Sequence, residues 1–241
     1  MRTMYKGRAP MLLLLAPLLA ASCKDGPFSP PYDPVLPGQW ANAVTNPYFP
    51  LTPGTRWEYT GETEDGTETI VVEVLATPRS VNGVSATVVH DRVYLDGELI
   101  EDTEDWYAQD DAGNVWYLGE DSREVENGVV VGTSGSWEWG ADGALPGIIM
   151  WAAPAAHVGE SYRQEYYRGE AEDWAKVLSA DESVQVPFGS FTGCVRTEEW
   201  NGLEGRSQSL EYKYYCPGAG LVLEVPAGEP TERIELTARI G

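Results

Sequence analysis

The residues with the greatest capacity for chemistry in this chain are its acids, because 38 Asp plus Glu stand against 16 Lys plus Arg. Two carboxylates that face each other across a cleft can act as the general acid and base of a glycan hydrolase. With so many acids any fold brings such pairs together, so the count alone selects no catalytic residue. A Gly-x-Ser-x-Gly nucleophile motif is also missing from the sequence. We therefore predict that the protein is not an enzyme.

Two further candidate sites, a calcium-binding loop and a His–Asp pair, do not have the residue spacing or side-chain direction that their chemistry needs. The acidic turn Asp110–Asn114 offers oxygen ligands for Ca²⁺, but Ala112 and Val115 stand where an EF-hand loop needs Asp or Asn and Gly. We interpret it as a solvated turn. His90 is followed by Asp91, yet neighbours in a strand point to opposite faces, so the pair cannot act together as a base and its orienting acid. His90 is expected to be structural, and neither a metal nor a cofactor is expected.

The tryptophans offer a different chemistry, because exposed rings stack on sugars or anchor partner proteins. Three of them cluster in residues 134–159, an apolar stretch interrupted by Gly and Pro. For these three, packing in the core is the alternative. The candidate residues for binding a partner or ligand are Trp137, Trp139, Ile149, Met150 and Trp151.

The first 22 residues have the pattern of an export signal. Arg2, Lys6 and Arg8 form a basic start, and the apolar run Pro10–Ala21 follows. At about 12 residues, this run is too short for the roughly 20 that a membrane-spanning helix needs. Residues 1–22 are therefore predicted to be a signal peptide that is removed on export.

Cys23 follows directly after small residues, and this junction resembles the signal of bacterial lipoproteins. In that family the cysteine is lipidated, so the resemblance implies that Cys23 anchors the protein to a membrane. Ala20 departs from the family pattern, which usually has Leu there, and cleavage near Ser22 as an ordinary secretory signal is the alternative. Lys24 in place of Asp favours the outer membrane by the same resemblance. The expected location is the periplasm or the cell surface.

The segment after the anchor is rich in proline. Residues 23–45 carry five prolines, which favours a stiff, extended tether. The remaining residues, 46–241, are predicted to form a single β-rich domain. The net charge of the chain is −22, and such a surface repels phosphate backbones, so nucleic-acid binding is excluded.

Regularly spaced turns define the fold class. Between them lie β-branched and aromatic segments, including the aromatic hairpin Glu104–Glu120. This pattern predicts an all-β fold, an antiparallel meander forming a curved sheet, half-barrel or sandwich. Residues 134–159 are the one irregular apolar insertion, expected to be a loop or short helix over the sheet. The dipeptides that favour type I′ turns are Asp65–Gly66, Asn82–Gly83, Asp96–Gly97 and Asn127–Gly128.

The cysteines of the predicted domain, Cys194 and Cys216, stand equally far from a turn centred near residue 205. If the flanking strands pair about that turn, the two side chains lie opposite each other. An exported protein meets an oxidising environment, and two cysteines are too few for a metal site. A Cys194–Cys216 disulfide is therefore expected.

Three stretches of the domain resemble motifs of exported bacterial proteins of uncharacterised function. They are YFPLTPGTRWEY at 48–59, DWYAQD with GNVWY at 105–117, and YYCPGAGLV at 214–222. The resemblance implies no established activity, so no catalytic residue is transferred. More loosely, the chain is similar to curved-sheet periplasmic proteins that bind lipids or lipoproteins.

Together these features favour a lipid-anchored binding or accessory protein that docks a protein partner or a membrane complex. The anchor, the tether and the candidate aromatic surface motivate this interpretation. The first alternative is a carrier of a lipid or another hydrophobic ligand on the concave face of the sheet. A glycan-acting hydrolase is the less favoured alternative.

Overall fold

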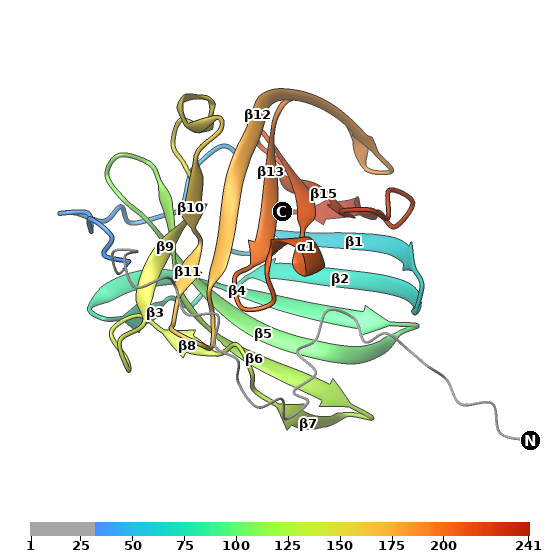
Figure 1. Cartoon of the computed structure of the whole chain (residues 1–241), viewed down its shortest axis with the longest axis horizontal. Coiled ribbons are helices and arrows are strands. Elements are labelled where there is room, and N and C mark those ends of the chain that lie inside the picture. Colours follow the sequence, from blue (N-terminus) through green and yellow to red (C-terminus); the bar gives the residue numbers. More distant parts are fainter. Residues whose placement is uncertain (1–31) are drawn as a thin grey trace, which may run out of the picture.

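The computed structural model describes residues 32–241, and its strands join in one antiparallel sheet that curls into a nearly closed barrel (Figure 1). The all-β prediction is therefore confirmed. The predicted signal peptide 1–22 and the predicted lipidation site Cys23 lie outside the described residues. Within residues 32–241, no helix is long and apolar enough to cross a bilayer.

The strands follow one another closely in the sequence. The first nine are β1 (Arg56–Thr63), β2 (Gly66–Val74), β3 (Arg79–Val81), β4 (Val84–Leu95), β5 (Glu98–Gln109), β6 (Val115–Glu126), β7 (Val129–Gly132), β8 (Trp137–Glu138) and β9 (Leu145–Met150). The others are β10 (Ser161–Arg163), β11 (Glu165–Tyr166), β12 (Asp173–Val186), β13 (Gly189–Asn201), β14 (Glu211–Cys216), β15 (Gly220–Pro226) and β16 (Ile234–Ile240). Two short helical turns, η1 (Pro154–His157) and α1 (Arg206–Ser209), interrupt them. Around the barrel the order is β10-β12-β13-β14-β15-β16-β1-β2-β4-β5-β6-β9-β11.

One short segment, residues 161–166, closes the barrel. Its first part, β10, pairs with β12 at one end of the sheet, and its second part, β11, pairs with β9 at the other end. Only Gln164 stands between these two strands. We call residues 161–166 the seam. Because the seam bonds to both ends of the sheet, it satisfies backbone groups that an open edge would leave unpaired.

The predicted turns have the expected backbone at three of four positions. Asn82, Asp96 and Asn127 have φ of 44°, 50° and 51°, and each is followed by a glycine with positive φ, as a type I′ turn requires. At Asp65–Gly66 only the glycine has a positive φ, of 145°. The turn dipeptides therefore mark the hairpins correctly, and they fix the turn type at the first three.

Residues 134–159, predicted to be irregular, contain β8, β9 and η1. Strand β9 pairs with β6 on one side and with β11 on the other. Its sequence, LPGIIM, contains no polar side chain, and four of its six residues are buried, so it shows no alternation of polarity. The expectation of a loop or short helix is therefore wrong for Leu145–Met150, which the barrel needs as a strand.

The described part of the predicted tether packs against the barrel and does not extend away from it. The amide of Ala41 donates to the carbonyl of Gln109 at 2.8 Å, and the Trp40 ring lies 6.1 Å from that of Trp116. Val44 is buried and pairs with Leu51. Aromatic and aliphatic side chains among the prolines give this segment apolar surface to bury, which the proline count alone conceals.

Cys194 and Cys216 form the expected disulfide, with Cα atoms 4.2 Å apart on the paired strands β13 and β14. The register next to it, Val195 opposite Tyr215, agrees with the turn position predicted from the sequence.

Replacing both cysteines (Cys194→Ala with Cys216→Ala) is expected to lower the free energy of unfolding by roughly 3 kcal/mol, because the cross-link restricts the unfolded chain. Urea denaturation followed by tryptophan fluorescence measures the loss. As a control, a reducing agent should weaken the wild-type protein and leave the double variant unchanged. An unaltered urea midpoint in the variant would contradict a stabilising role.

Candidate functional site

The barrel holds a cavity of about 310 Å³. One part of its wall is aromatic, and these rings come from the N-terminal segment and from five strands around the barrel. They are Phe49, Trp57, Tyr59, Tyr107, Tyr117, Trp200 and Tyr215. An aromatic wall alone would suit an apolar ligand, but the remaining wall has a different character.

Eight carboxyl groups also line the cavity, one from each of eight strands. Strands β4, β5, β6 and β11 contribute Asp91, Asp105, Glu120 and Glu165. Strands β12, β13, β14 and β15 contribute Asp173, Glu199, Glu211 and Glu224. We call these eight residues the carboxylate ring. A barrel interior lined in this way is costly, because buried charges must be paired or neutralised.

Strand alternation and two β-bulges aim these side chains inward. On β5, Asp105 and Tyr107 share the inner face, as residues two apart do in a strand. On β6, however, Tyr117 and Glu120 are three apart and both line the cavity. A register shift opposite Trp106 and Tyr107 adds one residue to β6 between them, and a bulge of this kind re-aims the next side chain. A second register shift, in β15, does the same for Leu221 and Glu224.

Three acids of the ring share one lysine. The Lys213 ammonium lies 3.0 Å from Glu211, 3.7 Å from Glu199 and 3.8 Å from Glu224. Burial alone would lower the pKa of Lys213, but these three carboxylates raise it well above its usual range. Lys213 is the only cationic residue among the described residues that line the cavity.

The other five acids of the ring, which include Asp91 and Asp173, form no ion pair with a basic side chain within residues 32–241, and two of them accept well-defined hydrogen bonds. Tyr117 donates to Asp105 at 2.5 Å, and the Trp137 indole donates to Glu165 at 2.7 Å. Within residues 32–241, no ion pair joins Asp105, Glu120 or Glu165 to a basic side chain. We call these three residues the unneutralised acids. Asp105 is only 8% exposed and Glu165 only 7%, so water cannot screen them fully.

Burial raises the pKa of six of the eight carboxyl groups in the ring, because a charged group loses its hydration inside the barrel. The pKa of Asp105 rises to about 7, although the bond from Tyr117 opposes the shift. Burial likewise raises the pKa of Asp173 and of Glu224 to about 7, with Lys213 opposing it. For Glu120 and Glu165, burial and mutual repulsion raise the pKa well above its usual range.

Gln164, the residue at the centre of the seam, also lines the cavity. It is only 5% exposed, and its Nε2 group has no hydrogen-bond partner. The backbone of Gln164 approaches β9 so closely that a Cβ atom at Gly147 would lie 2.3 Å from its carbonyl carbon. The seam therefore holds an unsatisfied donor in a fixed place at the cavity wall.

The described residues contain no group of three or more His, Cys, Asp or Glu side chains arranged to hold a metal ion. The acidic turn illustrates why. Asp110 accepts hydrogen bonds from the Asn114 amide at 2.8 Å and from the Trp116 indole at 2.9 Å. Asp110 is buried, so the interpretation of a solvated turn is wrong for this residue. Its oxygens organise the hairpin.

The predicted binding residues of 134–159 separate in the structure. Trp137 and Trp139 are buried, as the core alternative describes, and Met150 is also buried. Ile149 lines the cavity. Trp151 stacks on His157 and lines a second, largely apolar cavity of about 490 Å³, which the N-terminal segment borders through Tyr32 to Pro37. The five residues therefore do not form a single exposed surface.

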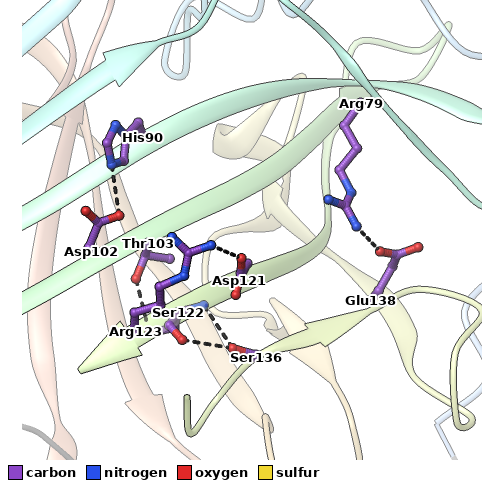
Figure 2. A network of polar contacts seen from close by, with 9 residues as sticks. All are labelled: Arg79, His90, Asp102, Thr103, Asp121, Ser122, Arg123, Ser136 and Glu138. Atoms are coloured by element: carbon purple, nitrogen blue, oxygen red, sulfur yellow. Dashed lines mark hydrogen bonds and ion pairs between the residues drawn. The ribbon is translucent and has the colours of Figure 1, made fainter. Parts of the chain in front are cut away.

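His90 is not among the residues that line the cavity, and Figure 2 shows it on β4 with its side chain facing Asp102. Its Nε2 atom is 3.0 Å from Asp102 Oδ1 on the adjacent strand. Asp91, the next residue, belongs to the carboxylate ring. The two residues thus point to opposite faces, as predicted from strand alternation.

The sequence pattern that could have helped to identify the inner face is a charged residue two positions before a tyrosine, as in Asp105 with Tyr107 and Lys213 with Tyr215. This pattern is hard to use alone, because it does not reveal which face is the interior. The bulge at Leu118–Gly119 moreover breaks the period before Glu120.

Gly119→Ala is expected to destabilise the protein by about 1–3 kcal/mol, because Gly119 has a φ of 137° and its Cβ would lie 2.3 Å from the Trp137 carbonyl oxygen. The matched control is Gly128→Ala in the turn that follows the same strand and joins β6 to β7, where φ is also positive but no atom lies within 4 Å of the Cβ. Thermal denaturation should show a larger loss for Gly119→Ala, and equal losses would argue against a sterically required bulge.

The raised carboxyl pKa values predict that stability falls as pH rises. Above the unfolded pKa, near 4, the unfolded chain releases protons that the folded Asp105 keeps up to about pH 7. In this pH range the folded state binds more protons than the unfolded state. The stability that the protonated Asp105 contributes is therefore fully present below about pH 4 and is lost as the pH rises to about 7. The free energy of unfolding of Asp105→Asn, relative to that of wild type, should therefore be higher at pH 8 than at pH 5 by on the order of 2 kcal/mol. Denaturation at both pH values measures it, with the exposed Asp111→Asn as a control that should show no gain.

Comparisons of the chain with protein-family models, with curated proteins and with solved structures found no match. No residue of the cavity can therefore be given a role by transfer from a relative. The chemistry of the carboxylate ring, its aromatic wall and its single lysine must indicate what the cavity can hold.

Proposed function

We propose that this chain is a binding protein that holds a small polar ligand inside its barrel. The observation that carries the proposal is the cavity itself. Its volume of about 310 Å³ falls within the size range of small-molecule sites, and aromatic rings and fixed polar groups converge on it. An interior needed only for stability would be filled with apolar side chains, because buried carboxyl groups reduce stability.

The proposed setting is extracytoplasmic. The predicted signal peptide and lipid on Cys23 would place the barrel in the periplasm or at the cell surface, with the outer membrane favoured. In this setting the protein would act as an accessory component that docks a protein partner or a membrane complex and supplies or retains the ligand. The acidic surface makes attachment through the lipid, rather than through anionic headgroups, the consistent arrangement.

Binding inside the barrel is better supported than binding through the predicted aromatic surface. Trp137 and Trp139 are buried, and the Trp137 indole already donates to Glu165. Of the predicted residues, Ile149 and Trp151 border cavities.

A carrier of a lipid or other hydrophobic ligand is the second candidate, and the second cavity favours it. Its wall is mainly apolar and includes Val35, Ile148 and Trp151. A glycan-acting hydrolase remains a third proposal, because the ring brings several carboxyl groups to one cavity.

Cavity filling tests the proposal. The full-length protein is purified in mild detergent, and its thermal unfolding is measured with a panel of small cations, anions, polyols and fatty acids. Leu221→Trp fills the cavity, because Leu221 is part of its wall. Val130→Trp, at a site that is 52% exposed, is the matched control. At least one polar compound should raise the melting temperature of wild type and Val130→Trp by several degrees and have no effect on Leu221→Trp.

If no compound distinguishes wild type from Leu221→Trp, the proposal is wrong. A response only to fatty acids that survives in Leu221→Trp would support the hydrophobic carrier. Release of reducing sugar from an added glycan, abolished by Glu120→Gln, would support the hydrolase.

A further inference from the structure

We propose that the ligand of the barrel is a small organic cation with a protonated primary amine, held between the carboxyl groups of Asp105, Glu120 and Glu165. This inference rests on the proposed function, since it names the class of ligand that the same cavity takes.

The uneven distribution of charge around the cavity is the first reason. Lys213 lies within 4 Å of three carboxylates of the ring, whereas the unneutralised acids have no basic partner among residues 32–241. A cation from outside can take the same position on this side that the Lys213 ammonium takes on the other. Carboxylates accept hydrogen bonds from N–H groups, so a primary ammonium can bond to one or two of these acids while the charge of the others still attracts it, and Glu120 is close enough to Glu165 and Asp105 for both to act on its pKa.

The aromatic wall beside these acids is the second reason. Tyr107 and Tyr117 stack on each other with ring centroids 4.8 Å apart, and Phe49 packs edge-on against Tyr107 at 5.1 Å. All three line the cavity. Aromatic faces attract cations, and the attraction grows where water is excluded. Carboxylates next to aromatic rings therefore select for positive charge and for the apolar stem that carries it.

Gln164 supplies an independent observation. Its side chain is almost fully buried, borders the cavity and leaves Nε2 without an acceptor. A buried donor without a partner costs about 1–3 kcal/mol, so a bound molecule that accepts from Gln164 Nε2 would recover that cost. An oxygen atom on the amine-bearing ligand would satisfy it.

Other ligand classes fit less well. An anion would face eight carboxyl groups and one lysine. A divalent metal lacks a suitable cluster among the described residues. A neutral polyol could bond to protonated carboxyl groups, but it would gain nothing from the attraction between the aromatic wall and a cation.

Binding of an ammonium should release protons. Burial raises the pKa of Asp105 to about 7, so this carboxyl is partly protonated near neutral pH. A bound cation favours the ionised form, and the proton leaves to solvent. The charged and titratable groups that act on Asp105 are Asp91, Glu101, Tyr107, Tyr117, Glu120, Glu165 and Lys213.

The test compares amines with neutral molecules of the same shape. Isothermal titration of the full-length protein uses glucosamine against glucose and 1,4-diaminobutane against 1,4-butanediol. At least one amine should bind ten-fold or more tightly than its neutral counterpart, and titration in two buffers of different ionisation enthalpy should show proton release. Glu120→Gln and Asp105→Asn should each weaken that amine at least ten-fold. Glu126→Gln, an exposed position on the same strand, is the matched control and should not.

Equal or tighter binding of the neutral counterparts, absence of amine binding, or unchanged amine affinity in Glu120→Gln would each overturn this inference. The proposed function would survive the first result if Leu221→Trp abolished the neutral ligand's binding. It would fail separately if no compound in the broader panel distinguished wild type from Leu221→Trp.

Discussion

A carboxylate that is taken out of water must be paired, protonated or solvated by something else, and this constraint governs the interior of the barrel. The protein uses the first two solutions in different parts of the carboxylate ring. Around Lys213, three carboxylates share one ammonium. Asp105 has no ammonium beside it; it accepts a hydrogen bond from Tyr117, and its raised pKa favours the protonated form. The carboxyl groups that face the cavity therefore lower the stability of the barrel. Loss of stability at a polar site is common where a protein binds a ligand.

Local patterns in the sequence were sufficient for the parts of the fold that depend on neighbouring residues. Strand β4 (Val84–Leu95) runs between two of the predicted turns, and Asn82, Asp96 and Asn127 have the predicted turn geometry. The position of the Cys194–Cys216 disulfide could be predicted because a hairpin register depends only on where its turn lies.

The candidate site could not be predicted in this way, because it depends on pairing between segments that are distant in sequence. The inner face of the sheet is defined only once the seam has paired with both β12 and β9. The sequence of the seam contains no pattern that predicts these two partners. The bulge before Glu120 reverses the face expected from alternation. Trp40 and Val44 pack on the barrel for a similar reason, since their partners, including Trp116 and Leu51, are identified only after folding.

The seam has a consequence for how the interior communicates with solvent. Strands β10 and β11 contribute three and two residues, whereas β12 beside them has 14. Opening these short ladders costs fewer backbone hydrogen bonds than separating any long pair of strands, so local unfolding should begin there. Gln164 lies at the centre of this segment and borders the cavity. Because the seam is a wall segment with short ladders and also borders the cavity, we expect it to be the first part of the wall to open, which would make it the natural route between the cavity and solvent.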